Sequence, residues 1–271
     1  MPTDGPDLDH IALAVEAQHE LWPLLVGEFG ATWLGGGESP GFNFAQVAFG
    51  NGVRVEVLEP ARVGENDFLR RFLDRSGPGP HHLTFKVPDI QATLAALDAA
   101  GWPAVGVDLT DPRWQEAFLR PSIAHGIVVQ VAQSDEELPL DDPPPGLPQP
   151  RPERPATLDR IVHLVADLER ATRLFGDLLS GTPAGEGGAD VGDHHYREMT
   201  WPGSGRLRLV QPTAEGPLAA WLGDRPGRLH HLELALDDPE RVPHALSRGD
   251  GTYEIAPANA CGTRIVLTLR P

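Results

Sequence analysis

The stretch LDHIAL at residues 8–13 recurs as LDRIVH at residues 158–163, and PHHLTF at residues 80–85 recurs as LHHLEL at residues 229–234. The separation is nearly the same for both pairs, so one unit of sequence occurs twice in the chain. The first copy has polar, metal-ligating side chains where the second has arginine or apolar residues. The chemistry is therefore expected in the first copy.

The size and composition of the chain are typical of a globular protein with two ordinary domains. It has 271 residues, of which 40% are hydrophobic, and no apolar run long enough to cross a membrane. A net charge of −17 argues against nucleic acid as a partner, because a phosphate-binding surface needs excess positive charge. The single cysteine, Cys261, excludes an internal disulfide, and no secretory signal pattern begins the sequence. We expect a cytoplasmic protein without a membrane partner.

The domain boundaries follow from a proline-rich stretch between the copies. Residues 135–157 include DDPPPGLPQPRP, and proline removes backbone donors and favours extended neighbours. This composition predicts a stiff, exposed linker. The predicted domains are residues 6–134 and 158–271.

Each half of the first copy has the order strand, helix, strand, strand, with one further weak strand that the pattern does not place. The expected elements are strand 8–15, helix 16–29, strands 42–49 and 53–58, then strand 82–87, helix 90–100, and strands 117–119 and 126–132. The second copy follows the same plan, with strand 158–165, helix 167–179, strands 206–210 and 230–236, helix 238–247 and strand 263–269.

Five phrases carry a resemblance to a known superfamily: LDHI at 8–11, VRVEVLEP at 53–60, GPHHLTFKVPDI at 79–90, FLRP at 118–121 and HGIVVQV at 125–131. They resemble the vicinal oxygen chelate superfamily of glyoxalases, bleomycin-resistance proteins and extradiol dioxygenases, and most of all its methylmalonyl-CoA epimerase family. The resemblance implies an α+β fold of four tandem βαβββ modules, which form two glyoxalase-like domains with curved mixed sheets.

The resemblance also implies a metal site, because each module of a domain supplies one ligand from its first strand and one from its last. Carried over position by position, the candidate ligands are His10, Glu56, His82 and Gln130. Two imidazoles, a carboxylate and a neutral amide suit a divalent ion such as Zn, Ni, Co, Mn or Fe. Such an ion can hold two oxygens of a substrate in its open positions.

This chain departs from the epimerase pattern because glutamate and glutamine have exchanged places. Gln130 cannot act as a general base near neutral pH, so Glu56 is the one proposed ligand able to move a proton. The exchange also weakens the dioxygenase interpretation, whose carboxylate comes from the position of Gln130. The resemblance further implies that two modules curl a sheet into a cleft. Gln46, on a strand lining that cleft, and His125, before a turn, are candidates for substrate binding.

The second copy has lost the ligand set. Arg160, Arg208 and Val266 occupy three of the four positions, and only His231 remains. Two guanidinium groups repel a cation; they could bind a carboxylate or phosphate, although a scaffolding role is favoured. The sequence His194-His195-Tyr196 is expected in a solvated loop rather than in a metal cluster.

The leading functional hypothesis is a metal-dependent lyase or isomerase that transfers a proton next to a chelated carbonyl or enolate of a small molecule. One alternative is a non-catalytic protein that sequesters a small molecule, as bleomycin-resistance proteins do. A second alternative is an Fe(II)-dependent dioxygenase. The substrate could be a CoA thioester or a glutathione adduct, and the protein a monomer or a homodimer.

Overall fold

The computed structural model describes residues 5–134, 142–188, 193–213 and 215–271. The first part of the predicted linker, residues 135–141, lies outside the described residues. Over the described part of the chain, no helix has both the length and the apolar character needed to cross a bilayer.

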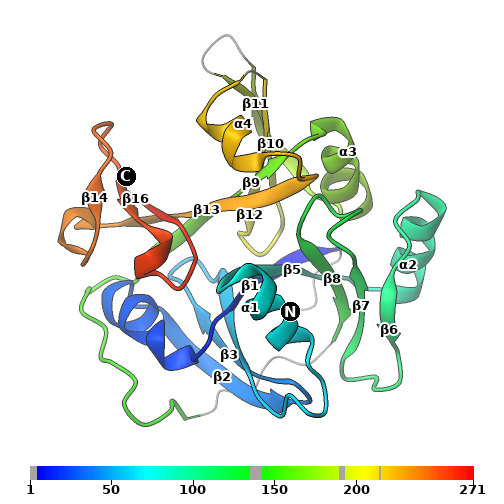
Figure 1. Ribbon diagram of the computed structural model, residues 1–271, viewed down its shortest axis with the longest axis horizontal. Helices are drawn as coiled ribbons and strands as arrows, with labels where there is room; N and C mark the ends of the chain where they lie inside the picture. The colour runs from blue at the N-terminus through cyan, green and yellow to red at the C-terminus, as the bar shows by residue number, and fades with distance from the viewer. Residues whose placement is uncertain (1–4, 135–141, 189–192, 214) are drawn as a thin grey trace. The chain divides into compact units, whose positions relative to one another are not determined.

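The first copy forms one curled, eight-stranded mixed sheet in the order β2-β3-β4-β1-β5-β8-β7-β6 (Figure 1). Strand β1 pairs in parallel with β4, and β5 pairs in parallel with β8. Each half of the sheet is therefore one βαβββ module, and the first strands of the two modules are the two central strands. The strands are β1 (Asp7–Ala14), β2 (Thr32–Ser39), β3 (Phe42–Ala48), β4 (Arg54–Pro60), β5 (Gly79–Lys86), β6 (Val105–Asp108), β7 (Gln115–Leu119) and β8 (Val128–Gln133).

Strands β2 and β6 are the weak strands that the sequence pattern did not place. Both lie at the edges of the sheet, and β2 contains three consecutive glycines, Gly35 to Gly37. Glycine has no side chain to pack and is a poor strand former, so the local pattern gives no strand signal there. Strand β2 forms because its backbone pairs with that of β3.

The helices of the first copy differ in part from the prediction. Helix α2 (Ile90–Ala99) is confirmed, with Asp89 capping its N-terminus and Gly101 following it at a φ of +87°. The predicted helix 16–29 is instead a 3₁₀ turn, η1 (Gln18–Glu20), and a π-helical segment, η2 (Pro23–Glu28). Pro23 interrupts the run because it has no backbone N–H to donate. Helix α1 (Phe68–Ser76) was not predicted.

The second copy forms another eight-stranded sheet with the equivalent order, β10-β11-β12-β9-β13-β16-β15-β14. The predicted fold class, two glyoxalase-like α+β domains with curved mixed sheets, is thus confirmed. The strands are β9 (Thr157–Val165), β10 (Thr182–Gly187), β11 (His194–Thr200), β12 (Arg206–Pro212), β13 (Gly227–Leu236), β14 (Leu246–Ser247), β15 (Tyr253–Ile255) and β16 (Ile265–Leu269). The helical segments are α3 (Leu168–Thr172), η3 (Arg173–Leu178), α4 (Pro217–Leu222), η5 (Pro239–Arg241) and η6 (Pro257–Asn259).

Two expectations for the second copy are wrong. The predicted helix 238–247 is only the short 3₁₀ turn η5, because Pro243 follows and forces Val242 into an extended conformation with ψ of 131°. The segment His194-His195-Tyr196 begins strand β11 rather than lying in a loop. Its pairing with β12 at Val210 to Pro212 provides the hydrogen bonds that its polar sequence did not indicate.

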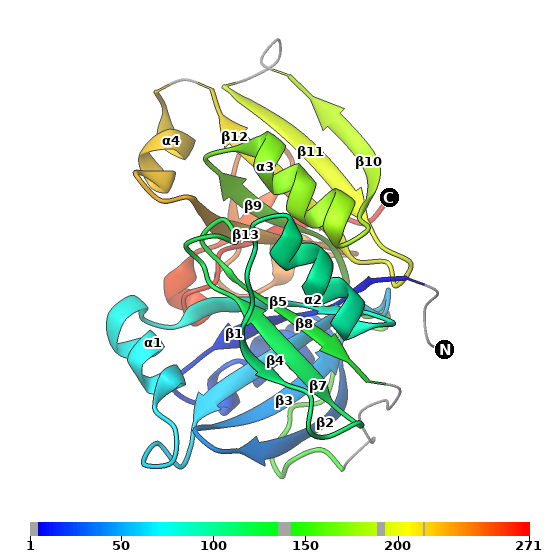
Figure 2. The same ribbon diagram turned by 90° about the vertical axis from the view of Figure 1, so that its right-hand side faces the viewer.

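By residue contacts, the chain divides into two compact units. One comprises residues 1–9, 82–137 and 160–230. Inside it the ring of Phe85 lies 5.2 Å from that of Trp201 and 6.0 Å from that of Phe175. Helices α2 and α3 lie side by side in this unit, and Arg170 stacks on Trp102 with 4.6 Å to the ring centre (Figure 2).

The other unit comprises residues 10–81, 138–159 and 231–271. In it the side chain of Asn51 donates a hydrogen bond to the carbonyl of Leu158, and Arg270 donates one to the carbonyl of Pro155. The end of the predicted linker thus packs along folded structure. Each unit therefore combines parts of both copies.

Each unit also contains a very close approach between a glycine and a facing stretch of backbone. Gly126 lies against Gly227 in the first unit, and Gly262 lies against the backbone beside Gly79 in the second. A Cβ atom on Gly126 or on Gly262 would collide with a facing carbonyl oxygen. Only glycine, which has no Cβ atom, allows two stretches of backbone to come this close.

Candidate metal centre

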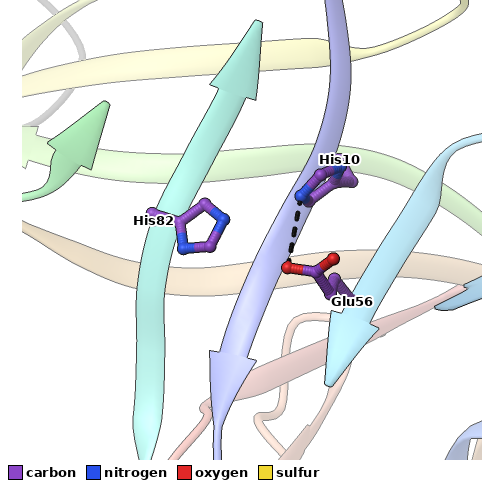
Figure 3. Close-up of side chains that lie close together, drawn as sticks. All are labelled: His10, Glu56 and His82. Atoms are coloured by element: carbon purple, nitrogen blue, oxygen red, sulfur yellow. Dashed lines mark ion pairs between the residues drawn. The ribbon is translucent and has the colours of Figure 1, made fainter. Parts of the chain in front are cut away.

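Three buried side chains of the first sheet converge on one point: His10 from β1, Glu56 from β4 and His82 from β5 (Figure 3). One ligand atom from each lies within 4.8 Å of the others. A divalent ion bound at about 2.0–2.2 Å from nitrogen and oxygen needs donors three to four ångströms apart. Small side-chain rotations would therefore bring the three onto one ion.

The order of strands explains why these residues meet. Strands β4, β1 and β5 are consecutive neighbours, so side chains on one face of the three strands are adjacent. Glu56 pairs with Ala12 on β1, two residues from His10, and side chains two apart in a strand share a face. The repeated strand motif in the sequence thus becomes one cluster in space.

The carboxylate of Glu56 is held from two sides. Its Oε2 lies 3.5 Å from Nε2 of His10, and its Oε1 accepts a hydrogen bond of 3.1 Å from the amide of Gln46. Gln46 is the residue opposite Glu56 on β3, so strand pairing itself brings the amide to the carboxylate. Among the predicted substrate-binding residues, Gln46 is therefore placed directly beside the cluster.

Gln130, the fourth predicted ligand, has both ends of its amide engaged. Its Oε1 accepts a hydrogen bond of 2.6 Å from Thr84, and its Nε2 donates one of 2.7 Å to Glu116. The amide oxygen of Gln130 has two lone pairs, so it can accept from Thr84 and still bind an ion. Ligation by Gln130 therefore stays a prediction. The hydrogen bonds nevertheless orient this side chain independently of any ion.

Glu116 is a residue of this face that the sequence analysis missed. Its Oε2 accepts hydrogen bonds from both Gln130 and the indole N–H of Trp114, at 2.7 and 2.8 Å. Glu116 lies two positions from Phe118, which pairs with Gln130 across β7 and β8. Side chains two positions apart in a strand share a face, so the alternation around Phe118 could have identified Glu116. Using this signal requires the register between β7 and β8.

His81, next to His82, is a buried neighbour of the cluster. Its ring lies 4.7 Å from that of Phe72 on α1. Burial lowers the pKa of His81 to about 4, and the nearby charge of Glu56 opposes this shift. His81 is therefore neutral near pH 7, and its ring contributes apolar contact rather than charge.

His125, the other predicted substrate-binding residue, lies among residues of the second copy. Its ring centre is 6.5 Å from that of Phe175, and its carbonyl oxygen accepts a hydrogen bond of 2.7 Å from His163. Burial, reinforced by the charge of Arg170, lowers the pKa of the His125 ring. These contacts give His125 a packing role, and a role in substrate binding remains a prediction.

In the second sheet, an ion-pair cluster stands at the positions equivalent to the metal ligands. The buried Glu198 is 2.8 Å from Arg208, 3.1 Å from Arg160 and 3.5 Å from Arg206. Glu198 is opposite Arg208 on the neighbouring strand, as Gln46 is opposite Glu56 in the first sheet. The carboxylate of Glu198 thus forms ion pairs with all three arginines, which supports the scaffolding role for this copy.

The residues of the first cluster fit a divalent ion. Two neutral imidazoles and one carboxylate form a common ligand set for Zn²⁺ and first-row transition metals, and leave positions open. The buried amide oxygen of Gln46 adds a polar atom to which no described residue donates a hydrogen bond.

Residues 9–118 match the family model described as Glyoxalase/Bleomycin resistance protein/Dioxygenase superfamily. The resemblance of this part of the chain to that superfamily, inferred from the sequence phrases, is thus confirmed. No curated protein sequence matches the chain.

Among solved structures, a triple mutant of 4-hydroxymandelate synthase from Streptomyces coelicolor aligns with 100% of this chain and 95% of its own. Its TM-score is 0.64 at 14% identity, so the likeness concerns the two-sheet fold alone. A hypothetical protein from Bacillus halodurans C-125 is 25% identical over 49% of this chain and 96% of its own, with a TM-score of 0.44. Methylmalonyl-CoA epimerase from Mycobacterium tuberculosis is 21% identical over 48% of this chain and 89% of its own, with a TM-score of 0.43.

Proposed function

We propose that this protein is a metal-dependent lyase or isomerase that transfers a proton next to a metal-chelated oxygen of a small molecule. The observation that carries the proposal is the buried His10, Glu56 and His82 cluster, whose ligand atoms lie within 4.8 Å of one another. When bound, a divalent ion would act as a Lewis acid that lowers the pKa of a C–H bond beside the chelated carbonyl.

The roles of the residues follow from their chemistry. His10 and His82 would hold the ion as neutral imidazoles, which have no negative charge to weaken its Lewis acidity. Glu56 would accept the proton from carbon and return it to the same or a neighbouring atom, so the reaction involves no net oxidation. Gln46 holds one carboxylate oxygen of Glu56 by its hydrogen bond and thereby orients the base.

A second candidate function is oxygen activation at Fe(II). Two histidines and one carboxylate with open positions form the ligand set typical of non-haem Fe(II) oxygenases. A non-catalytic protein that sequesters a small molecule is the third possibility.

The net charge of −17 supports a small-molecule substrate rather than nucleic acid. The single cysteine is compatible with the reducing cytoplasm, where we place the activity. A monomer or a homodimer would serve this function equally.

The first experiment is metal analysis of the protein purified without added ions, with His82→Ala as the matched control. The proposal expects about one equivalent of metal in the wild type and a large loss in the variant. Equal metal content in both proteins would contradict the ligand assignment. No metal in either, together with no gain of stability on adding Co²⁺, Ni²⁺, Zn²⁺, Mn²⁺ or Fe²⁺, would favour a metal-free binding protein.

The second experiment follows solvent deuterium incorporation into a panel of 2-hydroxy and 2-oxo acids and thioesters, with and without oxygen. A proton-transfer enzyme exchanges deuterium under anaerobic conditions, and Glu56→Gln should lower the exchange rate at least a hundredfold while retaining the fold. Turnover that requires oxygen and consumes it in proportion would establish the oxygenase alternative instead.

A further inference from the structure

A cavity of about 640 Å³ lies beside the end of helix α2 and along α3 and η3, within the unit that comprises residues 1–9, 82–137 and 160–230 (Figure 2). Its volume falls in the range of about 300–1,000 Å³ that is common for sites of small organic molecules. Among the described residues that line it, none belongs to the His10, Glu56 and His82 cluster. A ligand of this cavity would therefore be independent of the proposed function.

Two arginines of this cavity, Arg170 and Arg173, lie over the ring of Trp102. Their guanidinium carbons are 4.6 Å and 5.8 Å from the centre of the ring. The ring is a fixed platform, because Trp102 is only 1% exposed and its Nε1 donates a hydrogen bond to the carbonyl of Ile123. A guanidinium stacks through its flat face, whereas its N–H donors lie in the plane of the group. The donors of both arginines therefore remain available to a ligand.

In the described part of the chain, neither of these guanidinium groups has a carboxylate within 4.0 Å. The acidic residues of the lining have other contacts or lie farther away. Glu169 accepts two hydrogen bonds from Arg197, of 2.7 and 3.2 Å, and Asp167 accepts one of 2.9 Å from the backbone N–H of Arg170. Asp177 completes the charged lining. Two positive charges thus share one ring with no carboxylate between them, which favours an anion there.

We infer that this cavity binds a small polar molecule that carries a phosphate group, such as a sugar phosphate, and that Arg170 and Arg173 hold the phosphate. The two residues are three positions apart in a helical segment, a spacing that places their side chains on one face. Guanidinium groups bind phosphate through paired N–H···O hydrogen bonds. A phosphate group carries a charge of about −1.5 to −2 at pH 7, which two arginines match better than the single charge of a carboxylate does.

The rest of the cavity suits the organic part of such a ligand. Apart from Ala100 and Trp102, the residues that line it are polar or charged, so hydroxyl groups find hydrogen-bond partners there. The contact of the arginines with a fixed ring restricts their side chains before the ligand arrives. This restriction lowers the entropy that binding costs.

The test is isothermal titration calorimetry of the full-length protein with ribose 5-phosphate, inorganic phosphate and ribose, at constant ionic strength. A chelator is present throughout, so that no metal ion can bind these probes at the candidate metal centre. Ribose 5-phosphate should bind most tightly, because it provides both the charge and the polar organic part. Binding of ribose 5-phosphate no tighter than that of inorganic phosphate, or no measurable binding, would overturn the inference.

Four variants locate the phosphate. Arg173→Gln and Arg170→Gln should each weaken the binding of ribose 5-phosphate about tenfold, because each removes a charge-assisted contact. Arg241→Gln is the matched control, since it makes the same change of charge at an exposed arginine on η5, outside the cavity lining. It should leave the affinity within about twofold of the wild type. Asp177→Asn should strengthen binding, because it removes negative charge from the lining.

The pattern across these variants decides between a specific site and a general effect of charge. Equal losses in Arg173→Gln and Arg241→Gln would mean that binding reflects overall charge, and the inference would be wrong. Wild-type affinity in both cavity variants would place the phosphate elsewhere and would overturn it as well. Arg170→Gln also removes a ring contact, so its circular dichroism spectrum is compared first. If that variant does not fold, Arg173→Gln and Asp177→Asn carry the test.

Discussion

The amide nitrogen of Gln130 donates a hydrogen bond to Glu116 over 2.7 Å, which ties the glutamine of the last strand to the strand beside it. Thr84 holds the amide oxygen from the other side at 2.6 Å. In the first module the equivalent position is Glu56, which instead belongs to the cluster with His10 and His82. The two halves of one sheet thus use equivalent positions for different purposes.

This difference predicts that Gln130 contributes far less to metal binding than His10 does. Gln130→Ala should retain about one equivalent of metal, because the two imidazoles and the carboxylate remain in place. His10→Ala should lose most of it, since removing a ligand typically weakens binding by orders of magnitude. Competition with a coloured chelator measures both affinities, and an equal loss in the two variants would make Gln130 a fourth ligand.

Gly126→Ala is predicted to destabilise the protein severely. The new Cβ would collide with the carbonyl oxygen of Gly227, and the φ of Gly126 is +82°. We expect a loss of about 4 kcal/mol or more in the free energy of unfolding, at the upper limit for a single substitution. Urea denaturation measures this loss.

Gly52→Ala is the matched control, because Gly52 has a φ of +83° but open space around its Cβ position. It should cost only about 1–2 kcal/mol for the left-handed backbone. Similar losses in the two variants would show that the close backbone approach contributes nothing.

Glu198→Gln should destabilise the second sheet, because it leaves three arginines near a neutral amide. Removing one partner of a buried ion pair costs about 3–5 kcal/mol, but we expect about 2 kcal/mol here. The reduction reflects solvent screening, since the side chains of Arg160, Arg208 and Arg206 are 25%, 27% and 49% exposed.

Phosphate provides the check on this interpretation. It should raise the melting temperature of Glu198→Gln more than that of the wild type at equal ionic strength, because the freed arginines can bind it. A variant as stable as the wild type, with no response to phosphate, would show that the cluster is not a stabilising ion-pair network.

The stability of the protein should fall as the pH is lowered below about 6.5, in part because of His163. Its ring is fully buried and donates to the carbonyl of His125, and burial lowers its pKa to about 4. The unfolded chain therefore binds a proton between pH 6.5 and 4 that the folded chain does not. The contribution is present above pH 6.5, is lost progressively down to pH 4, and amounts to about 3 kcal/mol.

His163→Gln tests this contribution, since glutamine can still donate to the carbonyl but does not titrate. The free energy of unfolding of the variant should fall less between pH 7 and 5 than that of the wild type. Parallel curves for the two proteins would assign the pH dependence to His81, His125 and other groups.

The sequence, through its resemblance to the superfamily, was sufficient for the fold class and for the three residues of the cluster. Strand phrases at residues 8–13 and 80–85 recur in the second copy, and alternating apolar residues in them indicate which side chains share a face. Because His10, Glu56 and His82 lie on such strands, the order of the strands in the known fold is enough to bring them together.

Other features depended on contacts between residues that are distant in the sequence. The edge strand β2 forms because β3 pairs with it, while the expected helix 238–247 fails at Pro243. The register of the paired strands was needed to identify two contacts. One is the hydrogen bond between Gln130 and Glu116, and the other is the ion pairing of Glu198 with its arginines.

The duplication could be read directly from the repeated phrases of the sequence. The two sheets and the loss of the ligand set in the second copy followed from the resemblance of those phrases to the superfamily. The hydrogen bonds of individual polar side chains became known only from the folded sheet. Thr84 donates to the amide oxygen of Gln130, whereas no described residue donates to that of Gln46. Whether a hydrogen bond forms depends on differences of a few tenths of an ångström in the distance between donor and acceptor. These distances are set by how the whole sheet pairs and twists.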